Sequence, residues 1–271
     1  MEIVHHFGIR ISGDSDRQEF VRLGIDLEAA TPLPNGNIIT SFEIGEHDPR
    51  WAEARRLAAK FQITEFARAR FRESEIDAAE TMSIFARSQH GYPEPSEKFG
   101  YLNATFDLSD YCSKCGTGLR QVRPFRVKSD PHLKRAIMQL NWIFDEFFVA
   151  SQVWLAVFEP LGVGCWPVVL DRTGEEIGSV VQLKVTHYAD LKLDKEGIVC
   201  SHCGRRKASL DLTGFSPSPI NAPAPIFKST QYFGSNATAF RRVLITSSLY
   251  TEIKKNSLRG IDFYPCGPES D

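Results

Sequence analysis

Two short cysteine motifs constrain this chain more than any other feature of its sequence. CSKCG supplies Cys112 and Cys115, and CSHCG supplies Cys200 and Cys203. In each motif the two intervening residues form a turn that directs both sulfurs toward one cation, and the glycine that follows can adopt a positive φ. Four thiolates about 2.3 Å from one ion are the ligands of a closed structural zinc site. We therefore predict one structural zinc ion bound by these four cysteines.

Disulfide bonds and redox-active thiol pairs are the alternatives for the same cysteines. The two cysteines outside the motifs, Cys165 and Cys266, lack this spacing and are expected to be inert buried thiols. The sequence that begins at Met1 lacks a basic segment followed by an apolar one, so we expect no signal peptide and a cytoplasmic location. Because disulfides are rare in the cytoplasm, metal binding is the favoured interpretation.

Composition and length limit the remaining classes of protein. The most apolar stretch, residues 147–158, is flanked by acidic residues and is too short to cross a bilayer, so we expect no membrane association. The formal net charge of -2 provides no overall basic field that would indicate nucleic acid. In the 271-residue chain, the turn-forming stretch at residues 91–100 predicts a boundary between an N-terminal α+β region, residues 1–98, and a second domain, residues 99–271.

Local signals predict the elements of the N-terminal region. Ser15 followed by Gln18 resembles a capping box, and Asp48 followed by Pro49 is typical of a helix start. Hydrophobic periodicity then predicts a strand at 6–11, a helix from Ser15 to Gly24, a strand at 38–44, a helix after Asp48 and a strand at 65–71. In the second domain, an apolar segment around Ile137 to Phe148 predicts a further helix.

Residues 147–168 and 243–266 share one layout. Each has a short apolar strand, a serine placed as a helix N-cap (Ser151; Ser247 or Ser248), a helix, a leucine and glycine, and an apolar strand ending near a proline. We interpret the two segments as a degenerate β-α-β internal repeat, although coincidence between two common patterns is the alternative. The predicted fold is therefore α+β, with a mixed N-terminal region followed by two β-α-β-like units bridged by a zinc-ribbon-like knuckle site.

The adjacent carboxylates Asp145 and Glu146 lie among aromatic residues in NWIFDEFFV. In such surroundings a carboxyl group with a raised pKa can act as a general acid. The alternatives are a solvent-facing pair between a helix and a strand, and a patch where acidic and aromatic side chains contact a basic partner. The chain contains no nucleophile elbow, P-loop, dinucleotide-binding or HExxH motif, so we predict that it is not an enzyme.

Basic residues lie close to the second cysteine motif: Arg205, Arg206 and Lys207 follow it directly. Because a closed cysteine site carries negative charge, their simplest role, shared with Lys114, is to offset that charge. The alternative is a phosphate grip of the kind that basic residues provide on zinc ribbons. No aromatic platform accompanies them, so nucleic-acid binding is the second choice.

The two motifs, the strand-Ser-helix-Leu-x-Gly-strand-Pro units and the closing segment VLITSSLYTEIKKNSLRGIDFYP together resemble the bacterial double-CXXCG motif proteins. The resemblance covers residues 111–265. Some members of that family are immunity proteins, encoded beside contact-delivered toxins that they neutralise. The resemblance implies zinc ligands at Cys112, Cys115, Cys200 and Cys203, and it implies no catalytic residues.

These observations predict a bacterial, cytoplasmic, zinc-stabilised protein that binds another protein. Its most concrete form is an immunity protein that covers the active site of a toxin, with Asp145 and Glu146 as candidate contacts. The alternatives are a zinc-ribbon nucleic-acid-binding protein that uses Arg205, Arg206 and Lys207, and an enzyme with an unrecognised site.

Overall fold

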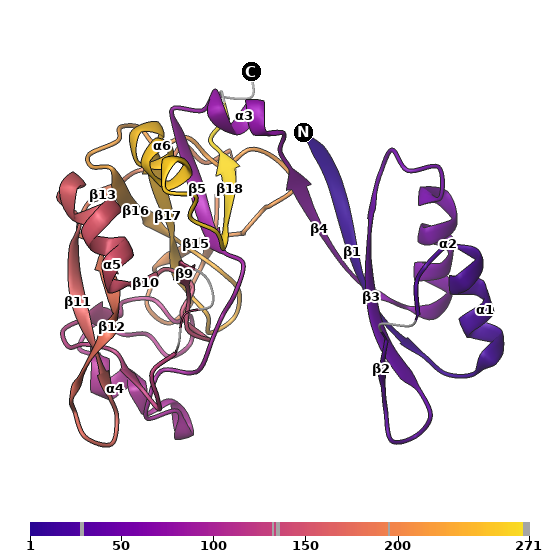
Figure 1. The fold of residues 1–271 in the computed structure, drawn as a ribbon, viewed down its shortest axis with the longest axis horizontal. Coiled ribbons are helices and arrows are strands. Elements are labelled where there is room, and N and C mark those ends of the chain that lie inside the picture. Colours follow the sequence, from indigo (N-terminus) through magenta and orange to yellow (C-terminus); the bar gives the residue numbers. More distant parts are fainter. Residues whose placement is uncertain (28–29, 132, 134–135, 195, 268–271) are drawn as a thin grey trace. The chain divides into compact units, whose positions relative to one another are not determined.

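The chain forms two compact units in the computed structural model, which describes residues 1–27, 30–131, 133, 136–194 and 196–267. The first unit contains residues 1–75 and 211–215, and the second contains residues 76–210 and those from 216 onward. Each unit combines helices with β-sheet (Figure 1), which confirms the predicted α+β class.

The division between the units falls at Glu75, whereas the sequence placed a boundary at residues 91–100. Strand β5 (Thr81–Ala86) accounts for the difference, because it pairs antiparallel with β17 (Phe240–Thr246) and with β18 (Ile261–Pro265). The turn-forming stretch that follows β5 is therefore a connection inside the second unit.

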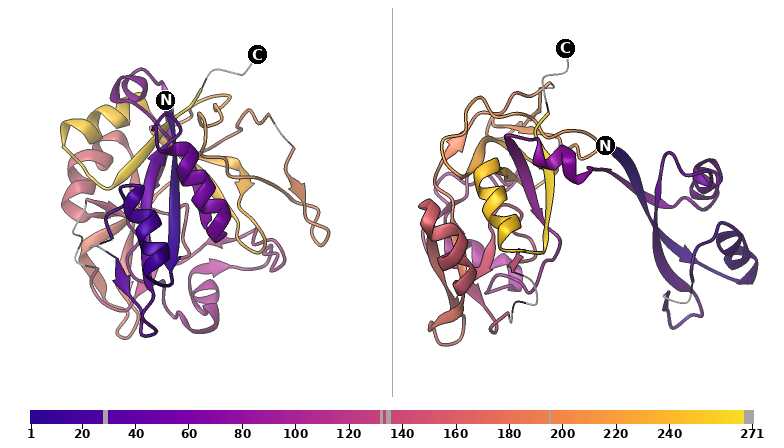
Figure 2. Two further views of the ribbon diagram at one scale, coloured as in Figure 1. Left: turned by 90° about the vertical axis from the view of Figure 1, so that its right-hand side faces the viewer. Right: turned by 45° about the horizontal axis from the view of Figure 1, so that its top comes forward.

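The first unit is an antiparallel sheet with helices on one face. Its strands lie in the order β2-β3-β1-β4, and Figure 2 shows α1 and α2 on the same side of them. This strand order with the chain order β-α-β-β-α-β is that of ferredoxin-like domains. The elements are β1 (Glu2–Ile11), α1 (Asp14–Arg22), β2 (Thr31–Pro32), β3 (Ile38–Gly45), α2 (Trp51–Phe61) and β4 (Thr64–Arg70).

Alternation along β1 determines which face of this sheet the helices cover. Phe7 and Ile9 are buried, and they form one cluster with Phe20 of α1 and Leu57 of α2. Arg10 alternates to the opposite face and is exposed. The strands and helices predicted for this region are confirmed, with ends that differ by a few residues.

The helix starts predicted for the first unit are wrong. Gly13 rather than Ser15 occupies the N-cap of α1. Arg50 rather than Asp48 occupies the N-cap of α2. Asp48 instead closes its own turn, because its Oδ1 accepts a hydrogen bond from the backbone N–H of Arg50 at 2.9 Å.

The predicted repeat segments, residues 147–168 and 243–266, fold as two strand–helix–strand units, which confirms that part of the prediction. The first unit contains β10 (Phe148–Ala150), α5 (Ser151–Val153) continued by η2 (Trp154–Phe158) and η3 (Glu159–Leu161), and β11 (Gly164–Leu170). The second contains β17, α6 (Ser247–Lys255) and β18. One antiparallel strand lies inside each: β12 (Glu176–Lys184) between β10 and β11, and β5 between β17 and β18.

The serines predicted as N-caps of these helices, Ser151 and Ser247 or Ser248, lie one or two positions too late. Ala150 and Thr246 occupy the N-caps, and neither makes a side-chain capping hydrogen bond. Ser151 uses its hydroxyl differently, donating to the carbonyl of Gly178 at 2.7 Å. This contact fixes the start of α5 to β12.

The helix predicted around Ile137 to Phe148 is also wrong. The segment forms β9 (Ile137–Met138), a turn, and β10, with Met138 opposite Phe148 in an antiparallel pair. Trp142, in the turn, has a φ of 69°, which a right-handed helix cannot contain. The two carboxylates of this segment therefore lie in a loop that leads into β10.

The two repeat units share one core. Figure 1 shows α6 beside α5, and Leu249 of α6 lies in the same buried cluster as Val157 of η2. One sheet has the strand order β8-β11-β12-β10-β9, where β8 is Arg126–Val127. A second has the order β14 (Ile198–Val199)-β15 (Arg206–Ala208)-β16 (Ile226–Phe233)-β17-β5-β18, with β13 (Tyr188–Ala189) beside β16. Strands β6 (Phe106–Asp107) and β7 (Arg120–Gln121) form a separate pair. Within the described residues, no helix has the length and apolar character that crossing a membrane requires.

The remaining elements are the short helices α3 (Glu73–Asp77), η1 (Glu97–Phe99) and α4 (Tyr101–Thr105).

Candidate metal centre

The cysteines of the two motifs lie together in space, although 84 residues separate Cys115 from Cys200. Their four Sγ atoms all lie within 4.8 Å of one another. The Sγ atoms of Cys112 and Cys200 are 4.0 Å apart, and those of Cys115 and Cys203 are 3.6 Å apart. A tetrahedral ion with bonds of about 2.3 Å to sulfur requires sulfur–sulfur separations of about 3.8 Å. The cluster therefore has the ligand atoms and the spacing to hold a metal ion.

Each motif forms the same turn at the end of a β-hairpin, the first between β6 and β7 and the second between β14 and β15. The N–H of Gly116 donates to the carbonyl of Cys112 at 2.7 Å, and the N–H of Gly204 donates to that of Cys200 at 2.9 Å. In both motifs the N–H of the first cysteine donates to the carbonyl five residues later, at 2.9 and 2.8 Å. This shared turn explains how one spacing directs two sulfurs toward one point.

The two motif glycines differ in their surroundings. Both have a positive φ, 82° at Gly116 and 72° at Gly204. A Cβ at Gly116 would lie 2.2 Å from the carbonyl oxygen of Ala237, whereas a Cβ at Gly204 would meet no atom within 4 Å. The first motif is therefore packed tightly against the loop between β16 and β17, and the second is open at this position.

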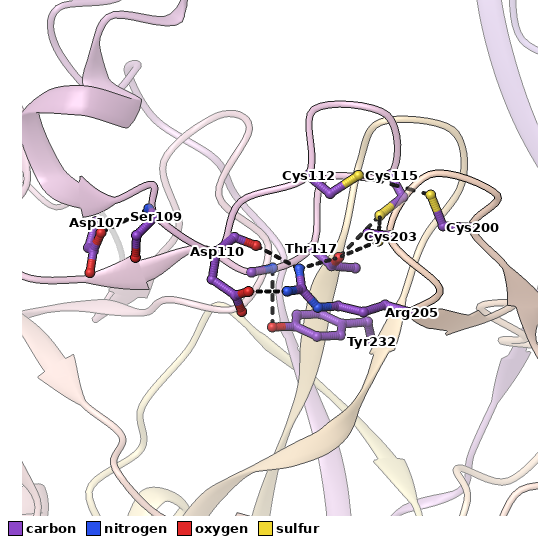
Figure 3. A network of polar contacts seen from close by, with 11 residues as sticks. Asp107, Ser109, Asp110, Cys112, Cys115, Thr117, Cys200, Cys203, Arg205 and Tyr232 are labelled. Carbon is purple, nitrogen blue, oxygen red and sulfur yellow. Dashed lines mark hydrogen bonds and ion pairs between the residues drawn. The ribbon is translucent and has the colours of Figure 1, made fainter.

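A polar network lies beside the sulfurs (Figure 3). The buried hydroxyl of Thr117 is 3.1 Å from Cys115 Sγ, and Arg205 Nη1 donates to the hydroxyl oxygen at 3.4 Å. Arg205 also donates to the backbone carbonyl of Asp110 at 2.6 Å and forms an ion pair with its carboxylate. Because its oxygen accepts from Arg205, the Thr117 hydroxyl is free to donate its hydrogen to the sulfur. Sequence reasoning missed Thr117, for which the available signal was its place directly after the motif glycine.

Lys207 of β15 donates hydrogen bonds to the backbone of the first motif and of a neighbouring loop. Its side chain is buried, and its Nζ donates to the carbonyl oxygens of Cys115 at 2.8 Å, Asn236 at 2.6 Å and Thr238 at 3.0 Å. An ammonium group has three N–H donors, so these bonds satisfy all of them. Lys207 therefore fastens the first motif to the loop between β16 and β17.

The basic residues that follow the second motif all have partners within the protein. Arg205 pairs with Asp110, Arg206 pairs with Glu196 at 2.7 Å, and Lys207 holds the three carbonyls. These contacts give each cation a structural role near the cysteines. Nucleic-acid binding through the three residues stays a prediction.

The thiols of Cys115 and Cys203 do not titrate independently. Burial raises the pKa of Cys115, but hydrogen bonds with Thr117 and with neighbouring sulfurs lower it overall to about 6. At Cys203 a backbone hydrogen bond at Arg205 lowers the pKa, but burial and the other three sulfurs raise it overall to about 11. Ionisation of one sulfur therefore opposes ionisation of the next, and a bound cation removes this opposition by compensating the charge.

The carboxylates Asp145 and Glu146 lie outside the cysteine cluster and in different environments. Glu146 is buried, forms an ion pair with Lys228 of β16 and accepts a hydrogen bond from Gln182 Nε2 at 3.0 Å. Burial raises the pKa of Glu146, while the charge of Lys228 opposes the rise. Asp145 is half-buried, and its Oδ2 accepts the backbone N–H of Arg241 at 3.0 Å.

Comparisons with known proteins add no assignment to this geometry. No protein-family model matches the chain. A comparison with curated proteins also gives no match. Membership of the double-CXXCG motif proteins therefore stays a prediction from the two motifs, and the site is interpreted from its own contacts.

Proposed function

We propose that the cysteine cluster holds one zinc ion and that this ion has a structural role. Four thiolates with tetrahedral spacing are the ligands of structural zinc sites, and they leave no position open for water or substrate. The matching turns and the sulfur separations support this proposal. The ion ties the hairpin β6–β7 to the hairpin β14–β15, and its binding energy contributes to folding.

We further propose that the protein acts in the bacterial cytoplasm by binding another protein, as a toxin-neutralising immunity protein and not as an enzyme. The observation that carries the proposal is the pair of CxxCG motifs closing on one cluster, the feature that resembles the double-CXXCG motif proteins. Neutralisation occurs by occlusion: a preformed surface, held in shape by the ion, covers the active site of the toxin.

Co-expression with the product of the neighbouring gene tests this function. That product should be toxic when expressed alone and tolerated when this protein is present. The variant Cys112→Ser should lose protection because it removes a metal ligand, whereas Cys165→Ser, which lies outside the cluster, should protect like the wild type. A neighbouring product without toxicity, or toxicity that this protein does not relieve, would contradict the proposal.

Binding experiments with DNA and RNA test the alternative function, nucleic-acid binding. DNA or RNA binding that weakens steeply with salt would indicate contacts to phosphates, because each such contact releases counterions. We expect no such binding, since Arg205, Arg206 and Lys207 contact groups of the protein itself.

A further inference from the structure

The second unit contains a pocket of about 790 Å³ beside the first cysteine motif. Its lining comes from the loop before β10, from β12, β16 and β17, and from the loop that carries the first motif. Along β12, Gln182 and Lys184 line the pocket, whereas Leu183 between them lies in the core shared with α5 and α6. The pocket thus lies on the face of the β12 sheet opposite α5 and α6, and it has the size of a binding site.

A buried ion pair forms one wall of the pocket. Glu146 is 8% exposed and Lys228 is 6% exposed, and they join the loop before β10 to β16. Gln182 donates to Glu146, and it also exchanges two amide hydrogen bonds with Gln121 at 2.7 and 2.8 Å. These contacts hold the wall in place without a ligand, so the polar surface is preorganised.

Asp145 differs from the other carboxylates of the lining. Those are paired: Asp107 with Arg120, Asp110 with Arg205 and Glu146 with Lys228. Among the residues that the structure describes, Asp145 has no cation within ion-pair distance. Its Oδ2 accepts a backbone N–H, and the charge of Lys228 acts on it only from beyond contact distance. Because it is half-buried, this carboxylate has lost part of its hydration, and a cation in the pocket would restore the lost stabilisation.

The side chains of Arg241 and Lys184, which also line the pocket, contact carbonyl oxygens and aromatic rings and not Asp145. Arg241 Nη1 donates to the carbonyl of Ser229 at 2.9 Å, and its guanidinium carbon lies 4.0 Å from the ring centroid of Tyr232. The Nζ of Lys184 lies 4.7 Å from the ring centroid of Trp166. Carbonyl oxygens and aromatic faces stabilise such cations, so the carboxylate of Asp145, bonded to a single backbone N–H, can accept a cation from outside.

Exposed aromatic rings gather beside the pocket. Trp142 lines it and is 38% exposed, and its ring centroid lies 4.5 Å from that of Tyr92 and 4.9 Å from that of Phe99. Tyr92 is 45% exposed and Phe99 is 53% exposed. Trp142 and Phe99 have φ values of 69° and 57°, a left-handed conformation that bulky residues rarely adopt. Clustered exposed aromatic residues are typical of protein–protein contact surfaces.

We propose that this pocket receives a basic side chain of a protein partner, which contacts Asp145 and lies beside the ring of Trp142. An arginine or a lysine from a partner loop supplies the cation, and apolar residues around it cover Tyr92 and Phe99. The inference identifies the contact surface of the proposed immunity function, and it rests on that function for the partner being a protein.

Titration of the metal-loaded full chain with two small probes tests the pocket directly. N-acetyl-arginine amide presents one guanidinium group, and N-acetyl-citrulline amide is its near-isosteric neutral counterpart. We expect saturable binding of the arginine probe in the millimolar range, followed by nuclear magnetic resonance, because a probe of this size makes few contacts. The citrulline probe should bind at least about tenfold more weakly, since it lacks the charge-assisted contact.

Two matched variants locate the contact. Asp145→Asn should weaken binding of the arginine probe by about tenfold, while the asparagine oxygen still accepts the N–H of Arg241. Glu175→Gln removes one negative charge from the exposed turn before β12, outside the pocket lining, and it should bind the probe like the wild type. Thermal unfolding of both variants confirms that each is folded.

Equal binding of the two probes, equal effects of the two variants, or no saturable binding of the arginine probe would overturn the inference. The outcome is separable from that of the proposed function. Protection from the toxin without probe binding would reject the pocket and retain the immunity function. Asp145-dependent probe binding without protection would retain the pocket and reject the immunity function.

Discussion

Substitution of the two motif glycines by alanine compares two positions that share a backbone conformation and differ in packing. Gly116 and Gly204 both have a left-handed φ, and both donate to the first cysteine of their motif. An alanine Cβ at Gly116 would lie 2.2 Å from the carbonyl oxygen of Ala237 and 2.9 Å from the backbone nitrogen of Ala239. At Gly204 it would meet nothing within 4 Å.

The expected costs follow from these contacts. A left-handed conformation costs an L-residue about 1–2 kcal/mol, which is the whole cost expected for Gly204→Ala. Gly116→Ala carries the same cost and must also displace backbone atoms, which adds about 1–3 kcal/mol. We therefore expect Gly116→Ala to lower the free energy of unfolding by about 2–5 kcal/mol.

Denaturant unfolding of the metal-loaded variants measures these costs, using the transition that a chelator shifts. Competition with a chromophoric chelator should also show weaker metal binding for Gly116→Ala, because the displaced turn moves the sulfur of Cys115. Equal destabilisation by the two substitutions would refute the tight packing of the first motif and the role of the loop between β16 and β17.

Three further predictions concern Lys207, the ion pair of Glu146 with Lys228, and the reactivity of the cysteine thiols. Lys207→Met should destabilise the protein by about 3 kcal/mol in thermal or denaturant unfolding, because the buried carbonyl of Cys115 and two partly buried carbonyls lose their charged donor. Exposed Lys114→Met should change stability by less than about 0.5 kcal/mol, and similar values for both variants would contradict the contacts of Lys207. Lys228→Met should cost about 3 kcal/mol by leaving Glu146 buried without its partner, and adding Glu146→Gln should restore part of the loss. Burial raises the pKa of Glu146, so protonation of Glu146 should restore stability to Lys228→Met as the pH falls through that raised pKa. A loss of unfolding free energy that does not change with pH would contradict this prediction. Alkylation followed by peptide mass spectrometry should find the four motif thiols protected in the metal-loaded protein and reactive after chelation. Cys266 should react most slowly after chelation, because burial raises its pKa. Fast reaction of the motif thiols before chelation would argue against bound metal.

The parts of the structure that sequence predicted well are those set by local geometry. Each CxxCG turn is closed by hydrogen bonds within six residues, so its spacing alone indicates that two sulfurs converge. The strand–helix–strand units are likewise continuous in sequence, and both are present. Helix starts were predicted less well, because Asp48 satisfies a turn of its own and Ser151 contacts Gly178 of a neighbouring strand.

The parts that sequence could not predict depend on partners distant in the chain. Strand β5 lies between β17 and β18, and no local pattern indicates a neighbour so far along the chain. Arg206 and Lys207 look alike as adjacent basic residues, yet alternation along β15 exposes the first and buries the second. Asp145 and Glu146 were treated as one pair. Both line the pocket, but Glu146 is buried in an ion pair with Lys228, whereas Asp145 accepts a backbone N–H.

A native mass spectrum of the purified protein, recorded before and after strong chelation, tests the central claim most directly. We expect a mass excess of one zinc ion per chain. Chelation should remove this mass and shift the charge states of the chain from a compact distribution to higher charge. We also expect loss of that ion from Cys112→Ser and Cys200→Ser. A metal-free protein that remains fully folded, or stoichiometric zinc retained by both variants, would contradict a structural ion held by the four cysteines.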